Sequence, residues 1–162
     1  MNPKKSSLIL LSILFFSAIS IKAQEQFDKS AFYSSMAADD INKVNDQLKI
    51  VDASSITVKN AYAGALLMKK AGLSKGASTK LNLFKSGYKK LEDAIKNNNA
   101  NVEFHFLRLM IQEHAPGILG YKNDIQKDSE LIKKSFQDLP EVVKHAISDY
   151  SKKSKILNPS DF

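Results

Sequence analysis

The chain of 162 residues contains no cysteine and no tryptophan. Without cysteine it cannot form disulfides, act as a thiol enzyme or bind a metal through thiolates, and lipoprotein acylation has no target. Glycine and proline are scarce, with six and four residues, and no segment alternates β-branched with polar residues. These absences favour an all-α domain that is stabilised by packing alone.

Motifs that carry catalysis or bind nucleotides are also absent. The sequence contains no G-x-S-x-G, HExxH, GxGxxG or Walker pattern, so it gives no support for a nucleophile, a zinc site or a phosphate-binding loop. His105 and His114 are nine residues apart, and His145 lies in a different segment. We therefore expect neither a bound metal nor a cofactor.

Residues 1–23 have the layout of a secretory signal peptide. Lys4 and Lys5 precede an apolar run over residues 8–21, and Ala23 supplies a small residue at a cleavage point. The alternative is an uncleaved membrane anchor, which needs about 20 apolar residues. We expect cleavage near Ala23, export to the periplasm or the outside of the cell, and no stable membrane insertion afterwards.

Cleavage changes the charge of the chain. The full sequence has 24 basic and 17 acidic residues, for a net charge of +7, and the three lysines within residues 1–23 would leave with no acid, giving +4. The remaining lysines are spread along every segment, so a nucleic-acid partner is not expected. We expect one helical domain over residues 24–150 and a flexible, lysine-rich tail over residues 151–162.

Apolar residues recur at spacings of three and four, which predicts about seven helices with short turns, arranged as antiparallel hairpins. The expected ranges are 27–36, 39–51, 58–71, 79–97, 101–114, 123–136 and 139–150. Small residues at Ala63, Gly64 and Ala65 predict that another helix approaches the third one closely.

The fourth predicted helix carries a pattern similar to the second helix of a tetratricopeptide repeat. Gly87, Leu91, Ala94 and the turn residue Asn99 follow the order of that motif. The Trp, Leu-Gly and Tyr signature of the repeat's first helix is missing, and no second clean repeat is visible. An irregular helical bundle therefore remains the alternative to a true repeat.

The mature chain also resembles a group of small secreted helical proteins of the Bacteroidota without an assigned activity. The resemblance rests on AYAGALLMKKAG at 61–72, on LEDAI at 91–95 with NVEFHFLRLMIQEHAPGILGY at 101–121, and on DYSKKSKIL at 149–157. It implies a helical fold resembling tetratricopeptide repeats and implies no chemistry.

The fifth predicted helix has one narrow polar stripe on an otherwise apolar surface. Asn101, His105, Arg108 and Gln112 share a face because they lie at i, i+4, i+7 and i+11. Arg108 is the only arginine of the chain, and its planar fork suits bidentate recognition of a carboxylate or phosphate.

Two interpretations of this stripe stay open. In the first, its four residues face a groove and bind an acidic group of a peptide or small ligand. In the second, Arg108 is buried and pairs with an acid of its own fold, and the candidates for that partner are Glu92, Asp93, Glu103 and Glu113.

The expected function is that of a non-enzymatic interaction module with a protein or peptide partner in the cell envelope. The alternative is a small periplasmic hydrolase or metal-dependent enzyme that uses His105, Arg108 and His114. The oligomeric state is left open. Two further groups have two readings each: Phe27, Phe32 and Tyr33 belong to the core or to a peptide groove, and Lys152, Lys153 and Lys155 to a solvated tail or to a membrane contact.

Overall fold

The computed structural model describes residues 27–162, and the predicted signal peptide therefore lies outside the described residues. Within that part of the chain all regular structure is helical, as predicted, with seven α-helices and three short 3₁₀ turns. The α-helices are α1 (Lys29–Ala37), α2 (Ile41–Ala53), α3 (Lys59–Leu73), α4 (Ala77–Asn97), α5 (Val102–His114), α6 (Ile125–Ser135) and α7 (Glu141–Ser151). Their ends lie close to those expected from the sequence.

Side chains of aspartate and asparagine fix where several helices begin. The carboxylate of Asp28 accepts hydrogen bonds from the backbone N–H groups of Ser30 and Ala31 at the start of α1. Asp40 does the same for α2. Such N-caps satisfy backbone donors that have no partner within the helix.

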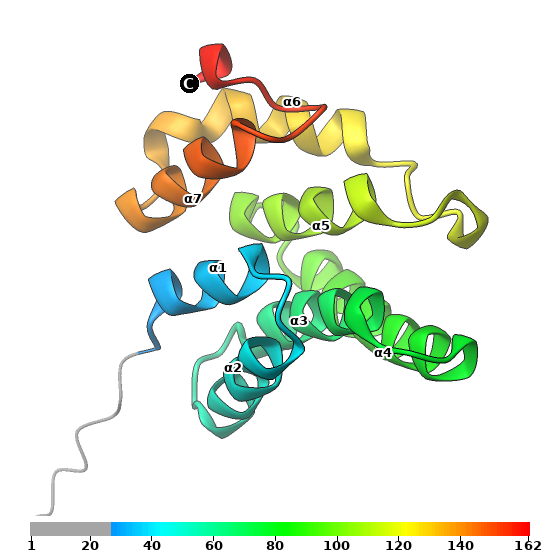
Figure 1. Cartoon of the computed structure of the whole chain (residues 1–162). Coiled ribbons are helices and arrows are strands. Elements are labelled where there is room, and N and C mark those ends of the chain that lie inside the picture. The colour runs from blue at the N-terminus through cyan, green and yellow to red at the C-terminus, as the bar shows by residue number, and fades with distance from the viewer. Residues whose placement is uncertain (1–26) are drawn as a thin grey trace, which may run out of the picture.

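Helix α5 runs through the middle of the molecule, with α6, α7 and the C-terminus on one side and α1 to α4 on the other (Figure 1). Consecutive helices pack on each other from α1 through α6, and α1 also contacts α7. Every residue of α5 from Glu103 to Gln112 is buried, which agrees with its nearly continuous apolar sequence.

The closest helix contact joins α3 to α4 at two glycines. A Cβ placed on Gly64 would lie 2.7 Å from the backbone nitrogen of Leu91 and 2.8 Å from the carbonyl oxygen of Gly87. Only glycine allows the two backbones to approach this far. The close approach expected from the small residues of α3 is confirmed.

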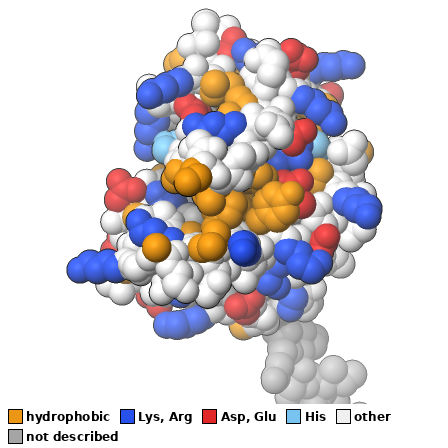
Figure 2. Space-filling model, turned by 90° about the vertical axis from the view of Figure 1, so that its right-hand side faces the viewer, with side chains coloured by type: hydrophobic (Ala, Val, Ile, Leu, Met, Phe, Trp, Pro, Cys, Tyr) orange, Lys and Arg blue, Asp and Glu red, His pale blue; other side chains and the backbone are white. Residues whose placement is uncertain are grey.

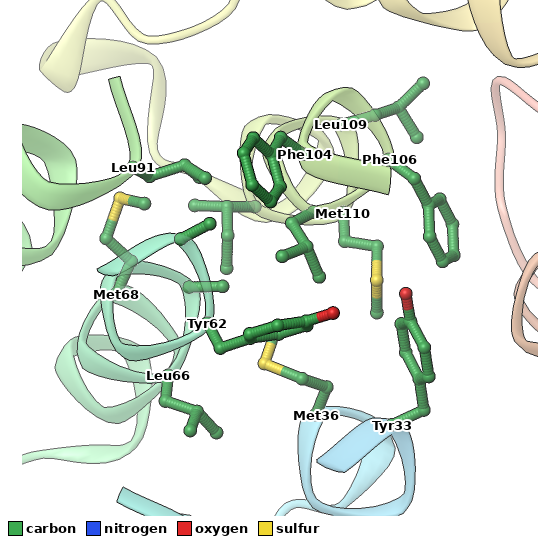
Figure 3. Close-up of a cluster of buried hydrophobic side chains, with 14 of the residues drawn as sticks. Tyr33, Met36, Tyr62, Leu66, Met68, Leu91, Phe104, Phe106, Leu109 and Met110 are labelled. Atoms are coloured by element: carbon green, nitrogen blue, oxygen red, sulfur yellow. The ribbon is translucent and has the colours of Figure 1, made fainter. Parts of the chain in front are cut away.

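The core takes side chains from all seven α-helices, and Figure 3 shows a cluster of them from α1, α3, α4 and α5. Phe32 and Tyr62 are fully buried and meet edge to face, with ring centroids 4.7 Å apart. Phe32 therefore belongs to the core. Tyr33 is buried too, and it also borders the groove described below.

The C-terminal segment 151–162 packs onto the domain, which corrects the expectation of a flexible tail. Leu157 is fully buried, and the ring of Phe162 lies 4.5 Å from that of Phe136. The carboxylate of Glu113 accepts hydrogen bonds from the hydroxyl of Ser154 and the backbone N–H of Lys155. The lysines of this segment are exposed, but its backbone is held by these contacts.

Candidate functional site

Asn101, the first residue of the predicted polar stripe, caps α5. Its side-chain oxygen accepts a hydrogen bond of 3.1 Å from the backbone N–H of Glu103. Asparagine is among the preferred N-cap residues because its side chain replaces a missing backbone acceptor. The structure thus gives Asn101 a local structural role.

Arg108 lies at the centre of a buried ion-pair network that joins α4, α5 and α6. Its Nε and Nη2 donate to the two carboxylate oxygens of Asp128, each at 2.7 Å. Its Nη1 donates to Glu92 at 3.0 Å and lies 3.5 Å from a carboxylate oxygen of Asp124. Arg108 is 5% exposed and Asp128 is fully buried. This two-pronged geometry is the strong form of an arginine–carboxylate pair.

His105 contacts the same aspartate from one turn earlier on α5. Its Nδ1 lies 2.7 Å from Asp128 Oδ1, and its Nε2 lies 2.9 Å from the backbone oxygen of Asn99. Both ring nitrogens therefore face an oxygen atom of the protein. Asp128 is thus the shared partner of two residues of the stripe.

In this network the charged groups stabilise one another's ionised forms, which opposes the effect of burial on their pKa values. Burial alone would raise the pKa of Asp128, but hydrogen bonds and positive charge from Arg108 and His105 hold that pKa below its usual range. For Arg108 the burial effect would lower the pKa, and the hydrogen bond and charge of Asp128 reverse it. Burial, and then the neighbouring Glu92, raise the pKa of the Tyr121 hydroxyl, which donates to Glu92 at 2.6 Å.

Gln112, the last residue of the stripe, is 1% exposed. Neither its side-chain nitrogen nor its side-chain oxygen has a hydrogen-bond partner among the residues that the structure describes. The amide is therefore enclosed by the fold and takes no part in the Arg108 network.

Of the two interpretations of the stripe, the structure shows the internal ion pair. Glu92 is the only one of the four acids proposed from the sequence that pairs with Arg108. The principal partner, Asp128, was missed. A signal for it existed, because Ile125, Asp128 and Ile132 lie at i, i+3 and i+7 on one face of α6. An acid within an apolar face requires a partner.

A second buried acid, Glu103, was one of the four candidate partners of Arg108, but it pairs with other residues. Its carboxylate accepts hydrogen bonds from the hydroxyls of Tyr33 and Tyr62 at 2.8 and 2.9 Å, and Lys29 approaches it at 2.6 Å. Glu103 is 7% exposed. Burial, followed by the charge of Glu103, raises the pKa of both tyrosines. This cluster connects α1, α3 and α5, and each of its own side-chain polar groups has a partner within it.

Of the three side chains in the enzyme alternative, His114 lies apart from the other two. His105 and Arg108 lie within the buried network, whereas His114 is exposed at the end of α5, with Nδ1 3.0 Å from the backbone oxygen of Met110. Among residues 27–162, no group of three or more histidines and acids is arranged to hold a metal ion.

The structure also has an apolar groove on its surface. It has a volume of about 1,440 Å³ and is lined by residues of α1, α3, α5 and α7, by the start of α4 and by the loop after α5. Figure 2 shows apolar side chains gathered in a hollow on this face, with lysines around them. The apolar residues that matter most below are Met36, Met68, Leu81, Phe84, Met110 and Ile118.

The groove carries an excess of positive charge. Its lining includes four lysines and two aspartates. Lys69 pairs with Asp39 and Lys152 pairs with Asp149. The other two groove lysines, residues 80 and 153, form no ion pair within the described residues. Sequence reasoning missed this groove, since its residues come from segments far apart in the chain.

Comparisons of this chain with family models, with curated proteins and with solved structures found no match. The similarity to secreted Bacteroidota proteins therefore stays a prediction. The interpretation of the site rests on the groove and on the buried networks themselves.

Proposed function

We propose that this protein is an exported, non-enzymatic interaction module that binds a protein or peptide partner of the cell envelope in its apolar groove. The observation that carries the proposal is the groove itself. Exposed apolar side chains that gather in a groove mark a candidate site for a partner. The exposed fractions of Leu81 and Ile118 are 41% and 95%.

The helices that line the groove support an arrangement similar to tetratricopeptide repeats. They include the alternate helices α1, α3, α5 and α7, together with the start of α4. In a stack of helix hairpins, the first helices of successive hairpins share one face, and such stacks bind partners on their concave surface. This part of the proposal rests on analogy of fold.

The buried networks support a role without catalysis. Two of the three residues of the enzyme alternative, His105 and Arg108, are enclosed and paired with Asp128. A substrate could not reach them without separating α5 from α6.

Export is proposed from the pattern of residues 1–23. None of the helices in residues 27–162 is long and apolar enough to cross a membrane. The mass of the intact protein recovered from the cell envelope tests this part, since we expect a chain that starts at Gln24. A chain that retains residues 1–23 would contradict it.

Affinity capture with three variants tests the function. The Leu81→Glu plus Ile118→Glu variant changes the groove, and Ile50→Glu is the matched control, because Ile50 is 51% exposed outside the groove. We expect a cell-envelope protein that binds the wild type and the Ile50→Glu control but not the groove variant. Equal capture by all three proteins would contradict the proposal.

A further inference from the structure

We infer that the occupant of the groove is an amphipathic helix that presents apolar side chains to the groove floor and acidic side chains to its lysines. This inference rests on the proposed function, because it names the class of partner for the same groove. Three observations carry it: the methionines that line the groove, the volume of the groove, and two lysines at its border that form no ion pair within the described residues.

All three methionines within residues 27–162 line this one groove. Met36 comes from α1, Met68 from α3 and Met110 from α5. Figure 3 shows Met36 and Met110 in the space between α1 and α5, whereas Met68 lies toward α4, next to Leu91. Methionine is unbranched and polarizable, so it adapts to irregular apolar shapes and is over-represented on surfaces that accept amphipathic helices. Met36 and Met68 are 3% exposed and Met110 is 9% exposed, so they are core residues that form the inner wall of the groove. Their flexible side chains can adapt to an apolar side chain placed against that wall.

The dimensions of the groove fit a helix. A helix about 11 Å wide with a rise of about 1.5 Å occupies roughly 140 Å³ per residue. The groove volume of about 1,440 Å³ thus corresponds to nearly three turns, which present apolar side chains at i, i+3, i+4 and i+7. A peptide bound by β-augmentation would need a free strand edge, and the described residues form no strand.

The charge of the groove selects acidic over neutral or basic partners. Lys80 and Lys153 are exposed, line the groove and form no ion pair in the described part of the chain. They come from α4 and from the segment after α7, so they lie on different elements of the lining. Acidic side chains on the flanks of a bound helix could therefore pair with Lys80 of α4 and with Lys153 of the segment after α7.

The test uses three fluorescein-labelled peptides of about 16 residues, with leucine at i, i+3, i+4 and i+7. Their remaining positions carry glutamate, glutamine or lysine. Fluorescence anisotropy with the purified protein measures each affinity. We expect the glutamate peptide to bind about fivefold more tightly than the glutamine peptide. This preference should disappear at about 1 M salt, where the Debye length is about 3 Å.

Charge reversal at the groove sharpens the test. The Lys80→Glu plus Lys153→Glu variant should bind the lysine peptide in preference to the glutamate peptide. Lys43→Glu plus Lys127→Glu is the matched control, because both residues are exposed and lie outside the groove. This control should retain the wild-type preference, and circular dichroism should give the same helix content for all variants.

The outcomes separate the inference from the proposed function. Equal binding of all three peptides would overturn the inference and leave a peptide-binding groove. If no peptide binds, and light scattering shows a dimer that Leu81→Glu dissociates, the occupant is a second copy of the chain and the inference is wrong. Displacement of the glutamate peptide by oleate below its micellar concentration, with no charge preference among the peptides, would identify an anionic lipid instead.

Discussion

The two sides of helix α5 differ in how completely the rest of the fold covers them and pairs their charged groups. On the side of α6, Arg108 meets Asp128 at 2.7 Å and is 5% exposed. On the side of the groove, apolar residues such as Leu81 and Ile118 remain exposed to solvent and have no cover in the described chain. We call the side that faces α6 the closed side, and it holds the paired charges. The groove side is open to solvent and mostly apolar.

From this difference we expect one set of residues to determine the free energy of unfolding and another to determine the proposed binding. The polar residues that stand out in the sequence are enclosed and paired, so changing them should affect the free energy of unfolding. The exposed groove residues Leu81 and Ile118 contribute less to the fold because solvent already reaches them, so changing them should affect the proposed binding. The predictions below compare equivalent changes on the two sides.

The largest effect is expected for Arg108→Ala. Removing one partner of a buried ion pair costs about 3–5 kcal/mol, because it leaves the buried Asp128 carboxylate without its arginine and with only His105 beside it. Urea unfolding followed by circular dichroism measures this loss. The Arg108→Met plus Asp128→Leu variant is the control, since removing both charges should recover most of the stability. A loss below about 1 kcal/mol for Arg108→Ala would contradict a structural role for the pair.

A matched pair of leucines compares the two sides directly. Leu157 is fully buried in the C-terminal segment, and Leu81 is 41% exposed at the groove. Leu157→Ala should cost about 2–5 kcal/mol, because it removes buried methyl groups and leaves a cavity. Leu81→Ala should cost less than about 1 kcal/mol. Similar losses for both variants in the same urea experiment would show that the C-terminal segment is not packed as described.

The pH dependence of stability should show the buried pair on the closed side. The pKa of Asp128 is lower in the folded chain than its ordinary value, which is about 3.9 in an unfolded chain. The ionised form therefore stabilises the fold fully above that value, and the contribution is lost as pH falls through it toward the folded pKa. Below about pH 4, the stability gap between wild type and Asp128→Asn should therefore narrow as the solution becomes more acidic. A gap that widens with acid would exclude this pair as its source.

The smallest effect on stability is expected in the groove. Leu81→Glu and Ile118→Glu place charges at exposed positions, so each should change the free energy of unfolding by no more than about 0.5 kcal/mol. Thermal unfolding of both variants beside Ile50→Glu checks this. A large loss for either groove variant alone would mean that the groove is part of the core.

Local patterns predicted much of the fold. Spacings of three and four gave the helices, and the small residues around Gly64 indicated the close contact with α4. The partner of Arg108 could have been found from Asp128, which interrupts the apolar face of α6. The packing of the C-terminal segment depends on Leu157 and on Glu113, and distant contacts of that kind leave no periodic signal. The groove was hidden for the same reason, because its methionines lie more than 30 residues apart in the sequence.

The most direct measurement is the affinity of the glutamate peptide for two variants, relative to wild type. The Arg108→Met plus Asp128→Leu protein changes only the closed side, and the Leu81→Glu plus Ile118→Glu protein changes only the groove. We predict an affinity within about twofold of wild type for the first and at least about tenfold weaker for the second. Loss of binding in the first variant with full binding in the second would contradict the account.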